Sequence, residues 1–128
     1  MGNRLTDAEL RVLMQRTRGV LAEQARARRP LTYLELADRV AMPGPQRIHR
    51  LTRLLEKLMK EDADAGRPLA AALVVSRVGH GLPAQGFFDR ARRLGVFDGE
   101  DPQAFHHAQL EALFAASGSV AGNKSMDV

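Results

Sequence analysis

Apolar residues recur every three or four positions over the first quarter of the chain, a spacing that predicts a long amphipathic helix. This helix is expected to run from Asp7 to about Arg28, and Pro30 ends it. Thr6 and, three residues later, Glu9 form a capping box, with a hydroxyl before the helix and a carboxylate in its first turn. One face of this helix should therefore be buried.

A second capping box, Thr32 to Glu35, predicts a short helix after Pro30. A turn must follow at residues 42–45, because the sequence Met-Pro-Gly-Pro cannot continue a helix. Pro45 is expected as the first residue of the next helix, where its missing N–H costs nothing. The residues of the short helix that are available for burial are Leu34, Leu36, Ala37 and Val40.

The third predicted helix, from about Pro45 to Ala63 with Gly66 near its C-terminal cap, has the clearest amphipathic pattern in the chain. Its apolar side chains share one arc, namely Ile48, Leu51, Leu54, Leu55, Leu58 and Met59. The opposite arc carries Gln46, His49, Arg50, Arg53, Lys57 and Lys60. We expect the first arc to be core and the second to face solvent.

The segment Leu69–Val78 predicts a strand, because it is almost continuously apolar and ends in β-branched residues. Two regions are candidates for its partner strand: the region of Leu31 and the glycine-containing segment near Phe87.

Two more helices are predicted after a tight loop at residues 79–83. The first contains Phe87 and ends at Gly95. Asp101 and Pro102 supply the N-cap and the first residue of the last helix.

These elements predict a mostly α (α+β) fold, a single domain of about five helices and one to three short strands around a helix-turn-helix or winged-helix-like core. The length of 128 residues suits one domain, which we assign to residues 1–116, with the helix-turn-helix-like part at residues 31–64. Residues 117–128 are rich in small and polar side chains and are expected to form a flexible tail.

The amino-acid composition excludes several functional classes. The chain has no cysteine, which excludes disulfides, cysteine-based metal sites and thiol chemistry. No apolar run approaches the roughly 20 residues that span a bilayer, and the polar N-terminus lacks the apolar core of a secretory signal. We therefore expect a soluble, cytoplasmic protein with no membrane attachment.

Positive charge is concentrated in the first half of the chain. The formal net charge is +4, and 16 of the 19 basic residues are arginine. Residues 1–53 carry 11 basic and 5 acidic side chains, whereas residues 54–128 carry 8 basic and 10 acidic ones. Such an asymmetry points to a polyanionic partner. A genome rich in G and C also raises the arginine content. Only the positions of the arginines can therefore distinguish a polyanionic partner from a bias in composition.

A short helix, a Pro/Gly turn and a basic amphipathic helix follow one another from residue 34 to residue 60, which is the layout of a helix-turn-helix. In that motif the second helix presents its first side chains to base edges and its cationic side chains to phosphates. The residues expected to contact nucleic acid here are Gln46, Arg47, His49, Arg50, Arg53 and Lys57. Two alternatives stay open: a solvated face without a ligand, and docking of an acidic protein by the same arginines, as in an immunity or adaptor protein.

Four segments between Leu31 and Phe88, about half the chain, stand in a recognisable order: Thr32-Tyr33-x-Glu35-Leu36-Ala37, then Pro43 and Arg47, then Val74-Val75-Ser76-Arg77, then Gly81-Leu82-Pro83-x-x-Gly86-Phe87. They resemble the winged-helix-like DNA-binding domain of the alkylguanine-DNA alkyltransferases and alkyltransferase-like proteins. The resemblance implies that Arg47 displaces a base and that Tyr33 contacts a phosphate. The family's Pro-Cys-His-Arg-Val-Val motif is missing, and the chain has no cysteine to replace it, which excludes alkyl transfer.

The same stretch also resembles an uncharacterised small bacterial domain with a Gly-Leu-Pro-x-x-Gly-Phe-Phe signature, which brings no established activity. Its loop supplies a second candidate site, made of His80, Gly81 and Gln85. Glycines beside a histidine expose backbone N–H groups and an imidazole to a ligand such as an anion. No glycine-rich phosphate-binding signature is present. A plain turn is one alternative, and an enzyme that uses His80 on a phosphate-bearing substrate is another.

No catalytic or metal-binding constellation stands out. His106 and His107 are adjacent, so on a helix their rings diverge and cannot share one metal ion. The chain has no Gly-x-Ser-x-Gly nucleophile elbow. We therefore expect no metal, no cofactor and no catalytic residue, and predict a non-enzymatic nucleic-acid-binding protein. A homodimer through the first helix is a further expectation.

Overall fold

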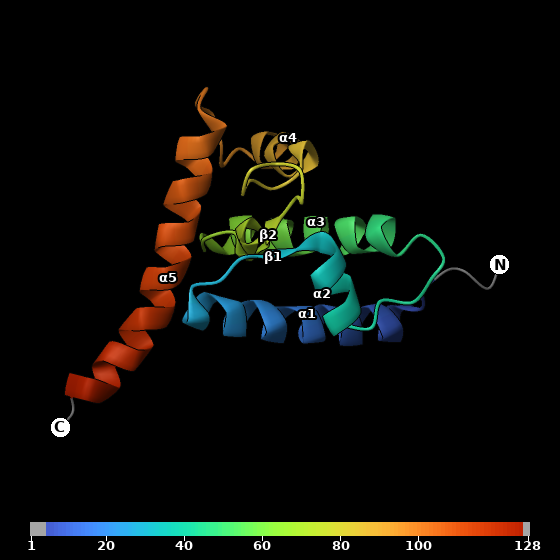
Figure 1. Cartoon of the computed structure of the whole chain (residues 1–128), viewed down its shortest axis with the longest axis horizontal. Helices are drawn as coiled ribbons and strands as arrows, with labels where there is room; N and C mark the ends of the chain where they lie inside the picture. Colours follow the sequence, from blue (N-terminus) through green and yellow to red (C-terminus); the bar gives the residue numbers. More distant parts are fainter. Residues whose placement is uncertain (1–4, 127–128) are drawn as a thin grey trace.

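The computed structural model describes the backbone of residues 5–126 and the side chains of residues 5–117. In this part of the chain, five α-helices and one 3-10 helix accompany a parallel sheet of two short strands (Figure 1). In chain order the elements are α1 (Asp7–Ala27), β1 (Leu31–Thr32), α2 (Tyr33–Arg39), α3 (Arg47–Ala65), η1 (Ala70–Leu73), β2 (Val74–Val75), α4 (Gln85–Arg93) and α5 (Pro102–Met126). The expectation of a mostly helical α+β fold is confirmed.

Helix α1 begins with the predicted capping box. The Thr6 hydroxyl accepts a hydrogen bond from the Glu9 backbone N–H at 3.1 Å, and the Glu9 carboxylate accepts one from the Thr6 N–H at 2.8 Å. The helix ends at Arg28, which has a left-handed φ of 56°. Its buried side chains recur every fourth residue, at Leu13, Thr17, Leu21 and Ala25. This spacing gives the single buried face that the sequence predicts.

Helix α2 begins with the second capping box, between Thr32 and Glu35. Leu36, Ala37 and Val40 are buried as predicted. The prediction for Leu34 is wrong, since its side chain is 45% exposed. Leu34 lies two residues before Leu36 and therefore about 200° away around the helix.

Helix α3 begins two residues later than predicted. Gln46 precedes it in the left-handed conformation (φ 59°, ψ 48°), which interrupts the helical path, so Arg47 is the first helical residue. Pro45 therefore belongs to the turn, where the Gly44–Pro45 peptide bond is cis. The predicted C-terminal cap at Gly66 is confirmed, with φ 69°.

The predicted apolar arc of α3 forms core at Leu51, Leu54, Leu55, Leu58 and Met59. Ile48 is the exception, because its side chain is 42% exposed. It belongs to the first turn of α3, where it lines an open concavity beside Gly44 and Pro45.

The predicted strand over Leu69–Val78 is wrong over most of its length, because η1 replaces its first half and only β2 remains. Side chains from other elements take the backbone donors at its start. The Asp62 carboxylate accepts a hydrogen bond from the Ala70 N–H at 3.0 Å, and the Gln109 amide oxygen accepts one from the Leu69 N–H at 2.7 Å. These donors are no longer available to a strand partner.

Strands β1 and β2 pair in parallel, with Leu31 opposite Val74 and Thr32 opposite Val75. Of the two partners considered for the strand, the Leu31 region is therefore confirmed. Within the described residues the only pairing is this parallel one, so no antiparallel hairpin accompanies the helix-turn-helix part as a wing.

Helices α1 and α3 run alongside each other, with α2 packed against both and α5 across one end of α1 (Figure 1). Buried side chains of α1, α2, α3, η1 and α4 form one continuous core. Near α4 and α5 the rings of Phe97 and Phe105 stack with centroids 4.4 Å apart.

Helix α5 starts as predicted, since the Asp101 carboxylate accepts a hydrogen bond from the Ala104 N–H at 3.1 Å and Pro102 is the first helical residue. The tail expected at residues 117–128 has a helical backbone as far as Met126. Its last two residues and the side chains after residue 117 lie outside the described part of the chain. The flexibility of this segment stays a prediction.

Candidate nucleic-acid interface

Five of the predicted nucleic-acid-binding residues line one open groove between the start of α1 and the first half of α3. We call it the α1–α3 groove, and its volume is about 1040 Å³. Helix α3 and the turn before it contribute Pro45, Gln46, His49, Arg50, Arg53, Leu54 and Lys57. The N-terminal part of the chain contributes Leu5, Asp7 and Leu10. The two walls thus come from segments about 40 residues apart in the sequence.

Most of the polar side chains in the α1–α3 groove are free. Those open to solvent are Gln46, His49, Arg53 and Lys57. No hydrogen bond or ion pair links any of these four side chains to another described residue. Arg50 is half-buried, and its Nη1 lies 3.5 Å from the Pro43 carbonyl oxygen, the outer limit of a hydrogen bond. Among the described lining residues only Asp7 carries a carboxylate, so the groove has a net positive charge.

Arg47 lies outside this groove and is used within the fold. Its Nε donates to the Met42 carbonyl oxygen at 2.9 Å, and its Nη2 donates to the Asp38 carboxylate at 2.8 Å. These bonds tie the start of α3 to α2 across the turn. The base-displacing role that the resemblance implies for Arg47 stays a prediction, and the guanidinium would have to leave Asp38 to perform it.

Tyr33 also makes contacts within the fold. Its hydroxyl accepts a hydrogen bond from the Ala84 N–H at 3.1 Å, just before α4. Its side chain lines a small cavity of about 20 Å³ together with Met59 and Phe87. Burial raises the pKa of the Tyr33 phenol, and the hydrogen bond from Ala84 lowers it by less. Tyr33 therefore joins α2 to the segment before α4, and its contact with a phosphate stays a prediction.

The glycine loop has the tight geometry that was predicted. His80 (φ 53°) and Gly81 (φ 86°) are both left-handed. The Ser76 N–H donates to the Leu82 carbonyl oxygen at 2.8 Å and closes the loop. The Gln85 amide donates at 3.1 Å to a carboxylate on the next turn of α4. Within the described residues no hydrogen bond connects His80, Gly81 and Gln85, and the role of the loop as a ligand site stays a prediction.

A buried carboxylate that the sequence reasoning missed holds α1 against α3. Asp62 is 1% exposed and pairs with Arg18 at 2.9 Å and with Arg67 at 3.0 Å. Arg18 also pairs with Glu61 at 3.0 Å. One arginine of the positive excess in residues 1–53, Arg18, is therefore paired within the fold. The sequence contains a signal for this burial, because Asp62 lies four residues after Leu58 and therefore on the buried arc of α3.

The side chains that line the α1–α3 groove can offer hydrogen bonds and positive charge to a ligand. Its described lining contains no Phe, Tyr or Trp ring on which an unpaired base could stack. Across the described residues, no three His, Asp or Glu side chains come together as a metal site would require. None of the described helices has both the length and the apolar character to cross a membrane.

No protein-family model, curated protein or solved structure matches this chain.

Proposed function

We propose that the protein binds duplex DNA through the α1–α3 groove, as a non-enzymatic binding protein. The observation that carries this proposal is the row of cations along one face of α3, made of Arg50, Arg53 and Lys57. Arg53 and Lys57 are exposed and have no partner among the described residues. Cations without an internal partner are available for phosphate groups, which supply most of the affinity of DNA-binding proteins.

The spacing of the row suits a phosphate backbone. Arg50, Arg53 and Lys57 follow each other at intervals of three and four residues and share one helical face. The seven steps along the helix from Arg50 to Lys57 correspond to a rise of about 10 Å. Since successive phosphates of one strand are about 3.4 Å apart along the duplex axis, the row can meet about three of them.

The start of α3 is the part that could read bases. Gln46 and His49 are exposed in the groove beside the cationic row. In a helix-turn-helix, the first residues of the second helix reach the base edges while the cations hold the backbone. The lack of Phe, Tyr and Trp in the described lining favours a duplex over a single strand, whose unpaired bases stack on such rings.

The test is fluorescence anisotropy with a labelled duplex of mixed sequence. Arg53→Glu combined with Lys57→Glu removes two phosphate contacts and adds repulsion, so we expect the affinity to fall by about 100-fold at low salt. Circular dichroism should show the same helix content as in the wild type, because both side chains are exposed.

The matched control is Arg28→Glu combined with Arg29→Glu, which changes the charge equally at the C-terminal end of α1. These two side chains are exposed and lie outside the α1–α3 groove. We expect their replacement to change duplex affinity by no more than about threefold, through weak long-range electrostatics. An equal loss in both variants contradicts the assigned site.

Failure of the wild type to bind any duplex contradicts the function itself and favours the alternative, an acidic protein docked by the same face of α3. Pairing of two copies through α1 stays a prediction, and the molecular mass of the protein in solution tests it.

A further inference from the structure

A second cationic surface lies on the other side of α1. Arg16 and Arg18 are two residues apart and therefore about 200° apart around the helix. Arg18 pairs with Glu61 and Asp62 of α3, whereas the Arg16 Nη1 donates to the Val40 carbonyl oxygen at the end of α2, at 2.9 Å. The side of α1 that faces α2 is thus distinct from the side that forms the α1–α3 groove.

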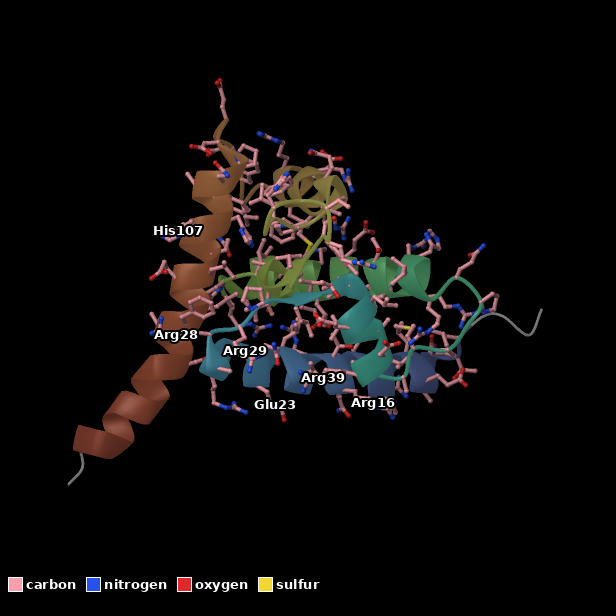
Figure 2. The ribbon with its side chains drawn as sticks, viewed as in Figure 1. Arg16, Glu23, Arg28, Arg29, Arg39 and His107 are labelled. Carbon is pink, nitrogen blue, oxygen red and sulfur yellow. The ribbon has the colours of Figure 1, made fainter. Side chains whose placement is uncertain are left out.

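Four arginines follow one another along this side of the molecule. Figure 2 shows Arg16, Arg39, Arg29 and Arg28 in a row along α1 toward α5, with Glu23 among them. The four guanidinium groups outnumber Glu23 and Glu9, which lies in the groove beside Arg16, so the row keeps a net positive charge. The Arg29 side chain is exposed and has no partner among the described residues.

Two of these arginines are held in place by contacts that leave part of each guanidinium open. Arg39 donates to the Glu23 carboxylate at 2.8 Å and to the Gln24 amide oxygen at 2.7 Å. The Arg28 guanidinium lies 5.3 Å from the centre of the Phe114 ring, on α5. Because these side chains are already ordered, binding an anionic partner costs less side-chain entropy than it would at free arginines.

An apolar groove of about 360 Å³ opens at the Arg16 end of the row. Its apolar lining consists of Leu5, Ala8, Val12, Leu13, Ala41 and Pro43. Glu9 and Arg16 are its charged lining residues. Val12 is 49% exposed, which leaves a large apolar side chain in water beside a cation. Such a pocket accepts an apolar anchor from a partner.

We propose that this surface docks an acidic peptide segment of a partner protein, with an apolar side chain in the groove and carboxylates on the arginine row. We call it the α1–α2 face, defined by Val12, Arg16, Arg28, Arg29 and Arg39. Guanidinium groups pair with carboxylates through two parallel hydrogen bonds, and an aliphatic or aromatic anchor would cover Val12. A DNA duplex fits less well, because it presents no apolar side chain and would leave the groove empty.

The dimensions set the length of the segment. Arg16 and Arg28 are twelve residues apart on α1, which corresponds to about 18 Å. An extended peptide covers this distance with about six residues. With its anchor in the groove, a segment of about eight to ten residues occupies the whole face. The proposal is independent of DNA binding, which uses the other side of α1.

The test is selection of random twelve-residue peptides, displayed on phage, against the intact protein, followed by anisotropy with labelled synthetic copies of the enriched peptides. We expect the enriched peptides to combine several Asp or Glu residues with Leu, Ile, Val or Phe. Their affinity should fall at least about tenfold in Val12→Asp and in the Arg28→Glu, Arg29→Glu double variant, as for the loss of a buried anchor or of charge pairs. Ala22→Asp also adds one negative charge at an exposed position of α1, and it should leave the peptide affinity unchanged.

Three results overturn the proposal. The first is that no peptides are enriched, or that the enriched peptides are not acidic. The second is that the affinity is the same in Val12→Asp and in the double arginine variant as in the wild type. The third is that duplex DNA binding is lost in the α1–α2 face variants and kept in Arg53→Glu, Lys57→Glu, which would assign the face to nucleic acid. The double variant on α3 should bind the peptides normally, so failure of DNA binding leaves this test intact.

Discussion

The Arg18 Nη1 and Asp62 Oδ1 atoms lie 2.9 Å apart and join α1 to α3 at a carboxylate that is 1% exposed. Arg67 Nε and the Ala70 N–H also reach this carboxylate, each at 3.0 Å. The α1–α3 groove lies toward the N-terminal ends of the same two helices. This buried pair thus joins the two helices that carry the walls of the groove.

Replacing Asp62 should destabilise the protein strongly. Asp62→Ala leaves the Ala70 N–H without its partner and removes the anion between two arginines, so we expect a loss of about 3 kcal/mol in the free energy of unfolding. Urea unfolding measures it. Glu61→Ala is the control, since its exposed pair with Arg18 should contribute less than about 1 kcal/mol. Equal losses in the two variants would contradict the role given to Asp62.

Stability should fall as the pH is lowered, because of His106. This buried imidazole donates from Nε2 to the Ala72 carbonyl oxygen at 2.8 Å. Burial is the main cause that lowers its pKa from the ordinary 6.5, and the Ala72 carbonyl opposes the shift. The unfolded chain therefore binds the proton more tightly than the folded protein does. The stabilisation is present above pH 6.5 and is lost as the pH falls through that value toward the lower folded pKa.

Urea unfolding at several pH values between about 5 and 8 measures this dependence, a range that contains the ordinary titration of histidine. The loss of stability should be smaller in His106→Gln, which cannot titrate. His49→Gln serves as the control and should keep the wild-type profile, because His49 is exposed and is not among the causes of the lowered His106 pKa. Identical profiles in all three proteins would show that another group causes the pH dependence.

Gly19→Ala should stabilise the protein. Gly19 lies in the interior of α1, and a Cβ atom there would meet nothing within 4 Å. Alanine loses less backbone entropy in a helix, so we expect a gain of about 0.5–1 kcal/mol. Gly66→Ala is the contrasting variant, because Gly66 has φ 69° and alanine is strained there. Thermal unfolding compares the two, and a gain at Gly66 together with a loss at Gly19 would contradict the backbone described.

Tyr33→Phe distinguishes a structural tyrosine from a DNA-binding one. The variant loses the hydroxyl that accepts the Ala84 N–H, so we expect a loss of about 1 kcal/mol in stability. Its duplex affinity should stay that of the wild type, since Tyr33 lies outside the α1–α3 groove. Anisotropy and urea unfolding give the two values. A large loss of affinity at unchanged stability would favour the phosphate contact that the family resemblance implies.

Local signals in the sequence were sufficient to predict the helices. Both capping boxes involve residues only three positions apart, so Thr6 and Thr32 mark the starts of their helices without help from the rest of the fold. The start of α3 was misplaced because Gln46 is left-handed, and no glycine marks that conformation in the sequence. A left-handed residue of another type is set by its surroundings.

Contact between distant segments explains both the error in the strand and the internal contacts of Arg47. The carboxylate of Asp62 and the amide of Gln109 capture backbone donors of the segment that had been predicted as strand. The ion pair of Arg47, which is expected to contact nucleic acid, could not be predicted because its partner, Asp38, lies on another helix. Helical periodicity places a side chain on an arc but does not show which other element meets it there.

The salt dependence of duplex binding tests the central claim most directly. With about three phosphate contacts in the α1–α3 groove, the logarithm of the binding constant should fall against the logarithm of the salt concentration with a slope of about −2.7. Arg53→Ala combined with Lys57→Ala should reduce the slope to about −0.9, because two contacts are lost. Binding that does not depend on salt, or a slope that is the same in the variant and the wild type, would contradict the account.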